Sequence, residues 1–136
     1  MENRLKLLEL FGLVIRCRIF LLLQCSIFPL IFLYPELWIK FELFIISLLI
    51  SIIIHESIHI ISSNKPKLKF SIFFIEVVSE KNDKKRLLVS TNAPIFTFLL
   101  GALLYELTGD IWISSPFILH LLLLPPDFAN FVLNER

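Results

Sequence analysis

The chain has 136 residues, of which 57% are hydrophobic and 18% are charged, and its formal net charge is +1. A soluble domain is usually about 45–50% apolar, so this composition, with a mean hydropathy of +0.82, is typical of an integral membrane protein. The small net charge gives no argument for nucleic-acid binding. We therefore predict one membrane-embedded domain over residues 1–136, in contact with the lipid bilayer and not with nucleic acid.

Long apolar segments follow one another along the chain. A helix needs about 20 residues to cross a bilayer, so each segment is predicted to span it, the third by tilting or by shielding from its neighbours. No small-x-small cleavage site follows the first segment, which is expected to be a retained helix rather than a signal peptide. The expected fold is an all-α membrane bundle of about four transmembrane helices. Their predicted bounds are 10–34, 41–62, 94–107 and 111–133.

The segment 64–92, between the second and third spans, has a different composition. Its sequence includes KPKLKFSIFFIEVVSEKNDKKRLLVST, which is rich in β-branched and aromatic residues and has a turn-like centre, EKNDKKR. This pattern predicts a small β-hairpin at the cytoplasmic membrane surface. A disordered basic loop is the alternative.

The positive charges predict the orientation in the membrane. The loop 64–92 carries seven Lys or Arg residues, whereas the connections at 35–40 and 108–110 carry only Lys40. Positive residues mark the cytoplasmic side. The N-terminus, the loop and the C-terminus are therefore predicted to be cytoplasmic. The basic residues of the loop are Lys65, Lys67, Lys69, Lys81, Lys84, Lys85 and Arg86.

Ionisable residues interrupt one of the most apolar runs, IIIHESIHIIS, as the motif H-E-x-x-H at 55–59. On a helix, positions i and i+4 share a face, so His55 and His59 can both bind one Zn²⁺. Glu56, beside the first ligand, can act as a general base towards a water molecule. Such residues within a span are costly and usually mark function. The alternative is a pair of structural, hydrogen-bonded histidines.

A catalytic zinc site needs a third protein ligand. At 1.5 Å per residue, His55 and His59 lie about 21 and 27 Å along a span that starts at Phe41, and Asp127 lies about 24 Å along a span that starts at Ile111. Asp127 is therefore the predicted third ligand. The candidates that this comparison of depths disfavours are Glu76, Glu80, Asp83, Glu106, Asp110 and His120.

The residues around Asp127 also favour this role. Pro125 and Pro126 precede it in LLLLPPDFANF, and proline breaks helix geometry, so a broken helix is expected to present the carboxylate inward. The alternative is a solvated Asp127 at the helix end. His120 is predicted to lie about 10 Å short of Asp127. It is either a residue that contacts a metal ligand without binding the metal, or simply a buried histidine.

At these residues the chain resembles the site-2 protease family of intramembrane zinc metalloproteases, and looks like a small, divergent bacterial-type member. His55, Glu56 and His59 match its H-E-x-x-H motif, and Pro125, Pro126 and Asp127 match the core of its proline-aspartate motif, although Phe128 replaces the glycine that follows. The resemblance implies a bacterial cytoplasmic membrane location. The family's G-P-x-x-N motif corresponds here to NAPIFT. The candidate substrate-positioning residues are Asn92, Thr97 and Asn130.

The predicted function is that of a zinc endopeptidase that cleaves a membrane-embedded or membrane-associated protein or peptide. One Zn²⁺ per chain is expected on His55, His59 and Asp127, with Glu56 as the catalytic base. The alternative from another class is a non-catalytic membrane immunity or sensor protein that binds zinc or a peptide. A metal transporter is a weaker alternative, because transport would favour more than one polar span.

Overall fold

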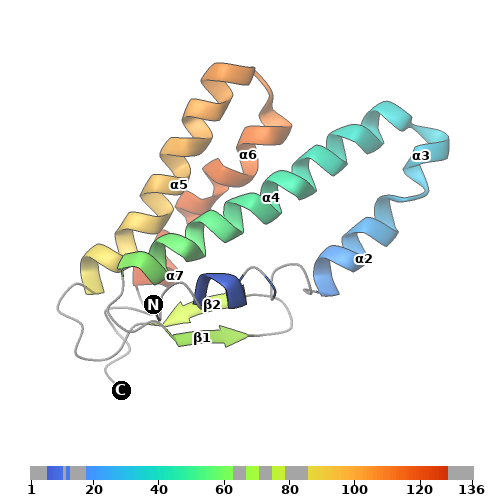
Figure 1. Cartoon of the computed structure of the whole chain (residues 1–136). Coiled ribbons are helices and arrows are strands. Elements are labelled where there is room, and N and C mark those ends of the chain that lie inside the picture. The colour runs from blue at the N-terminus through green and yellow to red at the C-terminus, as the bar shows by residue number, and fades with distance from the viewer. Residues whose placement is uncertain are drawn as a thin grey trace.

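The computed structural model describes residues 6–10, 12, 18–62, 67–70, 75–78 and 86–128. Three helical regions pack together at its centre: α4 (Pro35–Ser62), α5 (Arg86–Thr108) and α6 (Ile111–Leu119). Figure 1 shows α5 and α6 side by side, with α4 crossing beside them. Each of these helices contacts the other two, so α4 has neighbours that can cover one of its faces.

Helix α4 is the longest element that the structure describes, with 28 residues. Pro35 stands at its first position, where the fixed proline φ suits a helix and the missing N–H costs nothing. The helix therefore begins six residues before the predicted Phe41 and ends at the predicted Ser62. Before it, α2 (Arg18–Ile27) and α3 (Leu30–Leu33) form two separate helices instead of one continuous span from 10 to 34. Residues 11 and 13–17 of that predicted span lie outside the described residues.

A tight turn joins α5 to α6. Gly109 has a φ of +65°, a conformation that favours glycine, and its N–H donates to the carbonyl of Tyr105 at 2.8 Å. Asp110 then caps α6 by accepting a hydrogen bond from the N–H of Trp112 at 2.8 Å. The Trp112 ring meets Phe41 and Phe44 of α4 edge-on, with ring centroids 5.5 and 6.5 Å apart. These aromatic contacts attach the start of α6 to α4.

The chain after α6 does not continue as one straight helix. It passes into a 3₁₀ turn, η1 (His120–Leu123), and then into a short helix, α7 (Leu124–Phe128). The predicted span over 111–133 is expected to break at Pro125 and Pro126, but the helical geometry already changes at η1, five residues earlier. Residues 129–133 of that span lie outside the described residues. This break places Asp127 on an element of its own.

Two four-residue strands, β1 (Lys67–Phe70) and β2 (Ile75–Val78), pair antiparallel between α4 and α5, with Lys67 opposite Val78. The turn-like centre EKNDKKR lies outside the described residues, except for Arg86. The predicted boundary at Asn92 is wrong, because α5 already begins at Arg86 and carries Pro94 inside it. Proline removes one backbone donor and usually kinks or breaks a helix, but α5 continues on both sides of Pro94.

The prediction of about four membrane-spanning helices is wrong for the part of the chain that the structure describes. There, α4 is the one helix long and apolar enough to cross a membrane. The apolar stretches 21–33 and 111–122 are shorter than the roughly 20 residues that a span needs. The multi-pass topology that depended on four spans is not supported.

Candidate metal centre

One face of α4 carries a row of buried polar side chains at four-residue intervals. Residues spaced by four lie on one helix face, and this face meets α5 and α6. The two histidines of the row are almost completely buried, each about 1% exposed. The helix period and the packing of α4 therefore carry both imidazoles into the interior. The row consists of Ser47, Ser51, His55 and His59.

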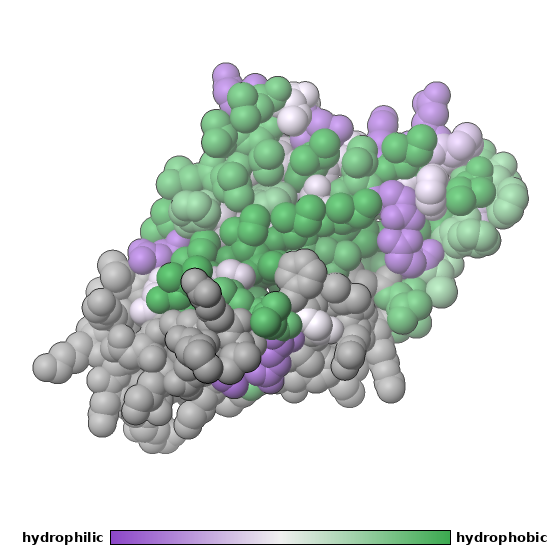
Figure 2. Space-filling view, in the orientation of Figure 1, coloured by the Kyte–Doolittle hydropathy of each residue, from purple (hydrophilic) through white to green (hydrophobic). Residues whose placement is uncertain are grey.

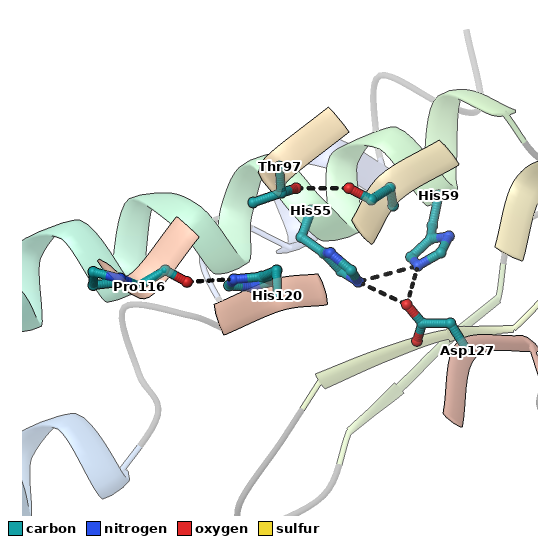
Figure 3. A network of polar contacts seen from close by, with 7 residues as sticks. His55, His59, Thr97, Pro116, His120 and Asp127 are labelled. Atoms are coloured by element: carbon teal, nitrogen blue, oxygen red, sulfur yellow. Dashed lines mark hydrogen bonds and ion pairs between the residues drawn. The ribbon is translucent and has the colours of Figure 1, made fainter. Parts of the chain in front are cut away.

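Asp127, on α7, completes a triangle with the two imidazoles. Oδ2 of Asp127 lies 3.0 Å from Nε2 of His55 and 3.3 Å from Nε2 of His59, and the two Nε2 atoms lie 3.2 Å apart. Figure 3 shows both rings and the carboxylate pointing towards one another. The Asp127 side chain is 17% exposed. Three ligand-type atoms from two separate elements thus meet at one point, a group that could hold a metal ion.

Hydrogen bonds alone do not account for this triangle. A neutral imidazole has one N–H, and an ionised carboxylate only accepts. If both Nε2 atoms carry hydrogen, two donors face each other at 3.2 Å. If either Nε2 lacks hydrogen, its lone pair faces the carboxylate of Asp127. No placement of the ring hydrogens makes all three contacts favourable, whereas a cation attracts the lone pairs of all three atoms.

The size of the triangle also fits a metal ion. With bonds of about 2.0–2.1 Å, the ligands of a tetrahedral Zn²⁺ lie about 3.3–3.4 Å from one another. The separation of 3.3 Å matches this value, and those of 3.0 and 3.2 Å are slightly shorter. Two imidazoles and one carboxylate form a donor set known for catalytic zinc. The residues present therefore fit the metal that the sequence motif predicts.

Glu56 lies within the same turn of α4 as His55 and is buried, with 9% of its surface exposed. A carboxylate in this setting is costly unless it has a partner or a role. Its place beside a metal-ligand candidate is the arrangement expected of a general base in H-E-x-x-H.

His120 lies much closer to the site than the sequence predicts. Its ring centroid is 4.8 Å from that of His55, with the two planes tilted by 45°. The prediction put His120 about 10 Å short of Asp127 on one straight helix, and therefore too far from the site. In the structure, His120 begins a 3₁₀ turn and reaches His55 instead. Figure 3 shows His120 on one side of His55, with Asp127 on the other. No sequence signal gives this contact, because it depends on the path of the chain after Leu119.

The predicted substrate-positioning residues have different surroundings. Asn92 lines a groove between α4 and α5 that is otherwise apolar. Thr97 is fully buried, and its hydroxyl donates to the carbonyl of Ala93 at 2.8 Å, within its own helix. Asn130 lies outside the described residues. The other residues of the groove are Ile58, Ile95, Phe96 and Leu99.

No known protein family, curated protein or solved structure matches this chain.

Proposed function

We propose that the protein is a membrane-associated zinc endopeptidase, with His55, His59 and Asp127 as the metal ligands. The observation that carries the proposal is the triangle of two Nε2 atoms and one Oδ2 atom, each within 3.3 Å of the others. The H-E-x-x-H sequence supports hydrolysis beyond metal binding, because a metal site alone does not require a glutamate beside its first histidine. The resemblance of these residues to site-2 proteases supports the same function.

The chain supplies the groups that a peptide hydrolysis needs. A bound Zn²⁺ lowers the pKa of a coordinated water and polarises a carbonyl group. Glu56 takes a proton from the attacking water while the water oxygen bonds to the scissile carbonyl carbon. When the C–N bond breaks, Glu56 returns that proton to the leaving amine. The carboxylate of Asp127 and the imidazoles of His55 and His59 would hold the metal in place.

The surface favours a location in the membrane. Helix α4 is long and apolar enough to cross a bilayer, and Figure 2 shows apolar side chains over most of the described surface in this view. Outward-facing apolar residues on α4 and α5 would contact lipid at no hydrophobic cost. These residues include Ile46, Ile50, Phe96, Leu99 and Leu103. The substrate class that suits this setting is an apolar peptide or a membrane-associated protein.

The strand pair gives such a substrate a place to bind in extended form. β1 and β2 pair only with each other among the described residues, so each has a free edge. An extended peptide can add to such an edge through main-chain hydrogen bonds. A substrate helix must unwind before its peptide bonds can be cut, and pairing with the edge of β1 or β2 would hold it unwound.

The variant Glu56→Gln tests the proposal, because it removes the base and keeps the size of the side chain. Membrane fractions of cells that produce the native chain or the variant are compared by mass spectrometry for new peptide termini, and the zinc content of both purified proteins is measured in detergent. We expect new termini only with the native chain and about one zinc per molecule in both, as for a three-ligand site. Identical termini in both samples would overturn the proposal.

A second function, metal binding without hydrolysis, is favoured by the burial of the site. His55 and His59 are each about 1% exposed, as in a closed structural site, which keeps no open position for water. Such a protein would act as a membrane immunity or sensor protein. Normal zinc content in the native chain together with the absence of any terminus that depends on Glu56 would favour this function.

A further inference from the structure

We infer that His120 is a positioning residue that holds the ring of His55 in the orientation needed to bind the metal. The inference rests on the proposed metal site and adds a residue that the H-E-x-x-H motif does not contain. Its starting point is the contact between the two rings, whose centroids are 4.8 Å apart. Aromatic rings attract one another at separations of about 4.5–7 Å.

His55 lacks the usual means of fixing a ligand histidine. In most metal sites, the ring nitrogen that does not bind the metal donates a hydrogen bond to a carboxylate, a carbonyl or a water molecule. Nε2 of His55 faces Asp127, which leaves Nδ1 for this purpose. Nδ1 is buried and has no hydrogen-bond partner among the described residues. The ring of His55 therefore depends on its neighbours for its orientation.

Two rings pack against His55. The His59 ring meets it edge-on, at a centroid distance of 4.9 Å and an angle of 82°. His59 is itself a ligand candidate and lies on the same helix as His55, so it does not fix the His55 ring relative to the rest of the fold. The tilted His120 ring comes from a different element and can restrict rotation of His55 from outside the helix.

His120 is itself fixed. Its Nδ1 donates to the carbonyl of Pro116 at 2.7 Å, and its side chain is buried, with 4% exposed. In a regular helix, the backbone N–H of His120 would bond to that carbonyl. Here it donates instead to the carbonyls of Phe117 and Ile118, as the helix tightens into η1. The tightening leaves the Pro116 carbonyl available for the imidazole. The contacts therefore link Pro116, His120, His55 and the metal site in order.

The variants His120→Phe and His120→Leu form a matched pair that tests this link. Both side chains are apolar, fill the space and lose the hydrogen bond to Pro116, but only phenylalanine keeps a ring against His55. Zinc affinity is measured by competition with a chelator in detergent, and the ligand-field spectrum is recorded with Co²⁺ in place of zinc. Ser114→Ala is the control for folding of α6, since Ser114 is buried there and its hydroxyl donates to Asp110, at the start of the helix.

We expect His120→Leu to lower zinc affinity by roughly 10–100-fold, as loss of a residue that orients a ligand does, and to change the cobalt spectrum. His120→Phe should bind zinc more tightly than His120→Leu, and Ser114→Ala should bind like the native chain. Equal affinities of the Phe and Leu variants, or native affinity in His120→Leu, would overturn the inference. Absence of zinc binding by the native chain would instead overturn the proposed metal site.

Discussion

Nε2 of His55 lies 3.0 Å from Oδ2 of Asp127, although 72 residues separate them in the sequence. Helix α4 supplies the first atom and the short helix α7 supplies the second. The contact places a carboxylate directly beside the H-E-x-x-H motif. Because the same oxygen lies 3.3 Å from Nε2 of His59, one side chain completes the candidate site.

Asp127→Ala should weaken zinc binding more than the roughly 10–100-fold expected for loss of a residue outside the ligand set. The two histidines alone leave the metal short of a ligand. Asp127→Asn should be nearly as damaging, because a neutral amide is a poorer ligand for Zn²⁺. Zinc content after dialysis, measured by elemental analysis, gives the result.

Asp110→Asn is the matched control for this carboxylate-to-amide change. Asp110 caps the N-terminus of α6, and asparagine caps a helix about as well as aspartate. This variant should therefore keep native zinc content. Native zinc content in Asp127→Asn and Asp127→Ala would contradict the assignment of the third ligand.

Removal of the metal should lower the stability of the folded chain. A ligand that binds only the folded state adds about 2.7 kcal/mol to the free energy of unfolding at a free concentration of 100 times its Kd. Thermal unfolding in detergent, with zinc or with a chelator, should therefore show a higher Tm with zinc. His55→Ala combined with His59→Ala should show the same Tm in both conditions. An equal zinc-dependent shift in this double variant would place the metal elsewhere.

Gly101→Ala should destabilise the packing of α5 on α6. A Cβ at this position would lie 2.7 Å from Cβ of Phe117 and 2.8 Å from the backbone nitrogen of Ile118. Overpacking of this kind typically costs about 1–3 kcal/mol, and the lower Tm should be seen by circular dichroism. Leu103→Ala, at an exposed position of α5, should shift the free energy of unfolding by only about 0.5 kcal/mol. A Tm of Gly101→Ala at or above the native value would contradict the close approach of the two helices.

The C-terminal end of α4 should face the cytoplasm. The basic segment follows this end, whereas the other end of α4 carries only Lys40 and the residues 19–34 before it carry no Lys or Arg. Positive residues favour the cytoplasmic side. Single cysteines at Glu36 and Asn82, in a chain without Cys17 and Cys25, are exposed to a reagent that does not cross membranes. In intact cells, we expect labelling at Glu36 and none at Asn82. The opposite pattern would reverse the orientation.

Local sequence was enough to predict the first half of the candidate site. A four-residue spacing puts His55 and His59 on one face of any regular helix, and α4 is one regular helix from Pro35 to Ser62. The sequence also predicted Asp127 as the third member, from depth and from the prolines before it, and the structure brings these three residues together. Periodicity and proline chemistry act over a few residues, so they can be read directly from the chain.

The tertiary structure alone decided how the chain runs after α6 and what it brings to the site. Counting 1.5 Å per residue along a straight helix placed His120 about 10 Å short of Asp127 and too far from the metal, yet its ring lies against His55. Apolar segments in the sequence predicted four spans, whereas α4 is the one described helix that is long and apolar enough to cross a membrane. The sequence gives the length and polarity of a segment. The prolines at 125 and 126 predicted a break before Asp127, but the change to 3₁₀ geometry begins earlier, at His120. Which distant side chain His120 then meets depends on packing between α4, α5 and α6, which no local pattern encodes.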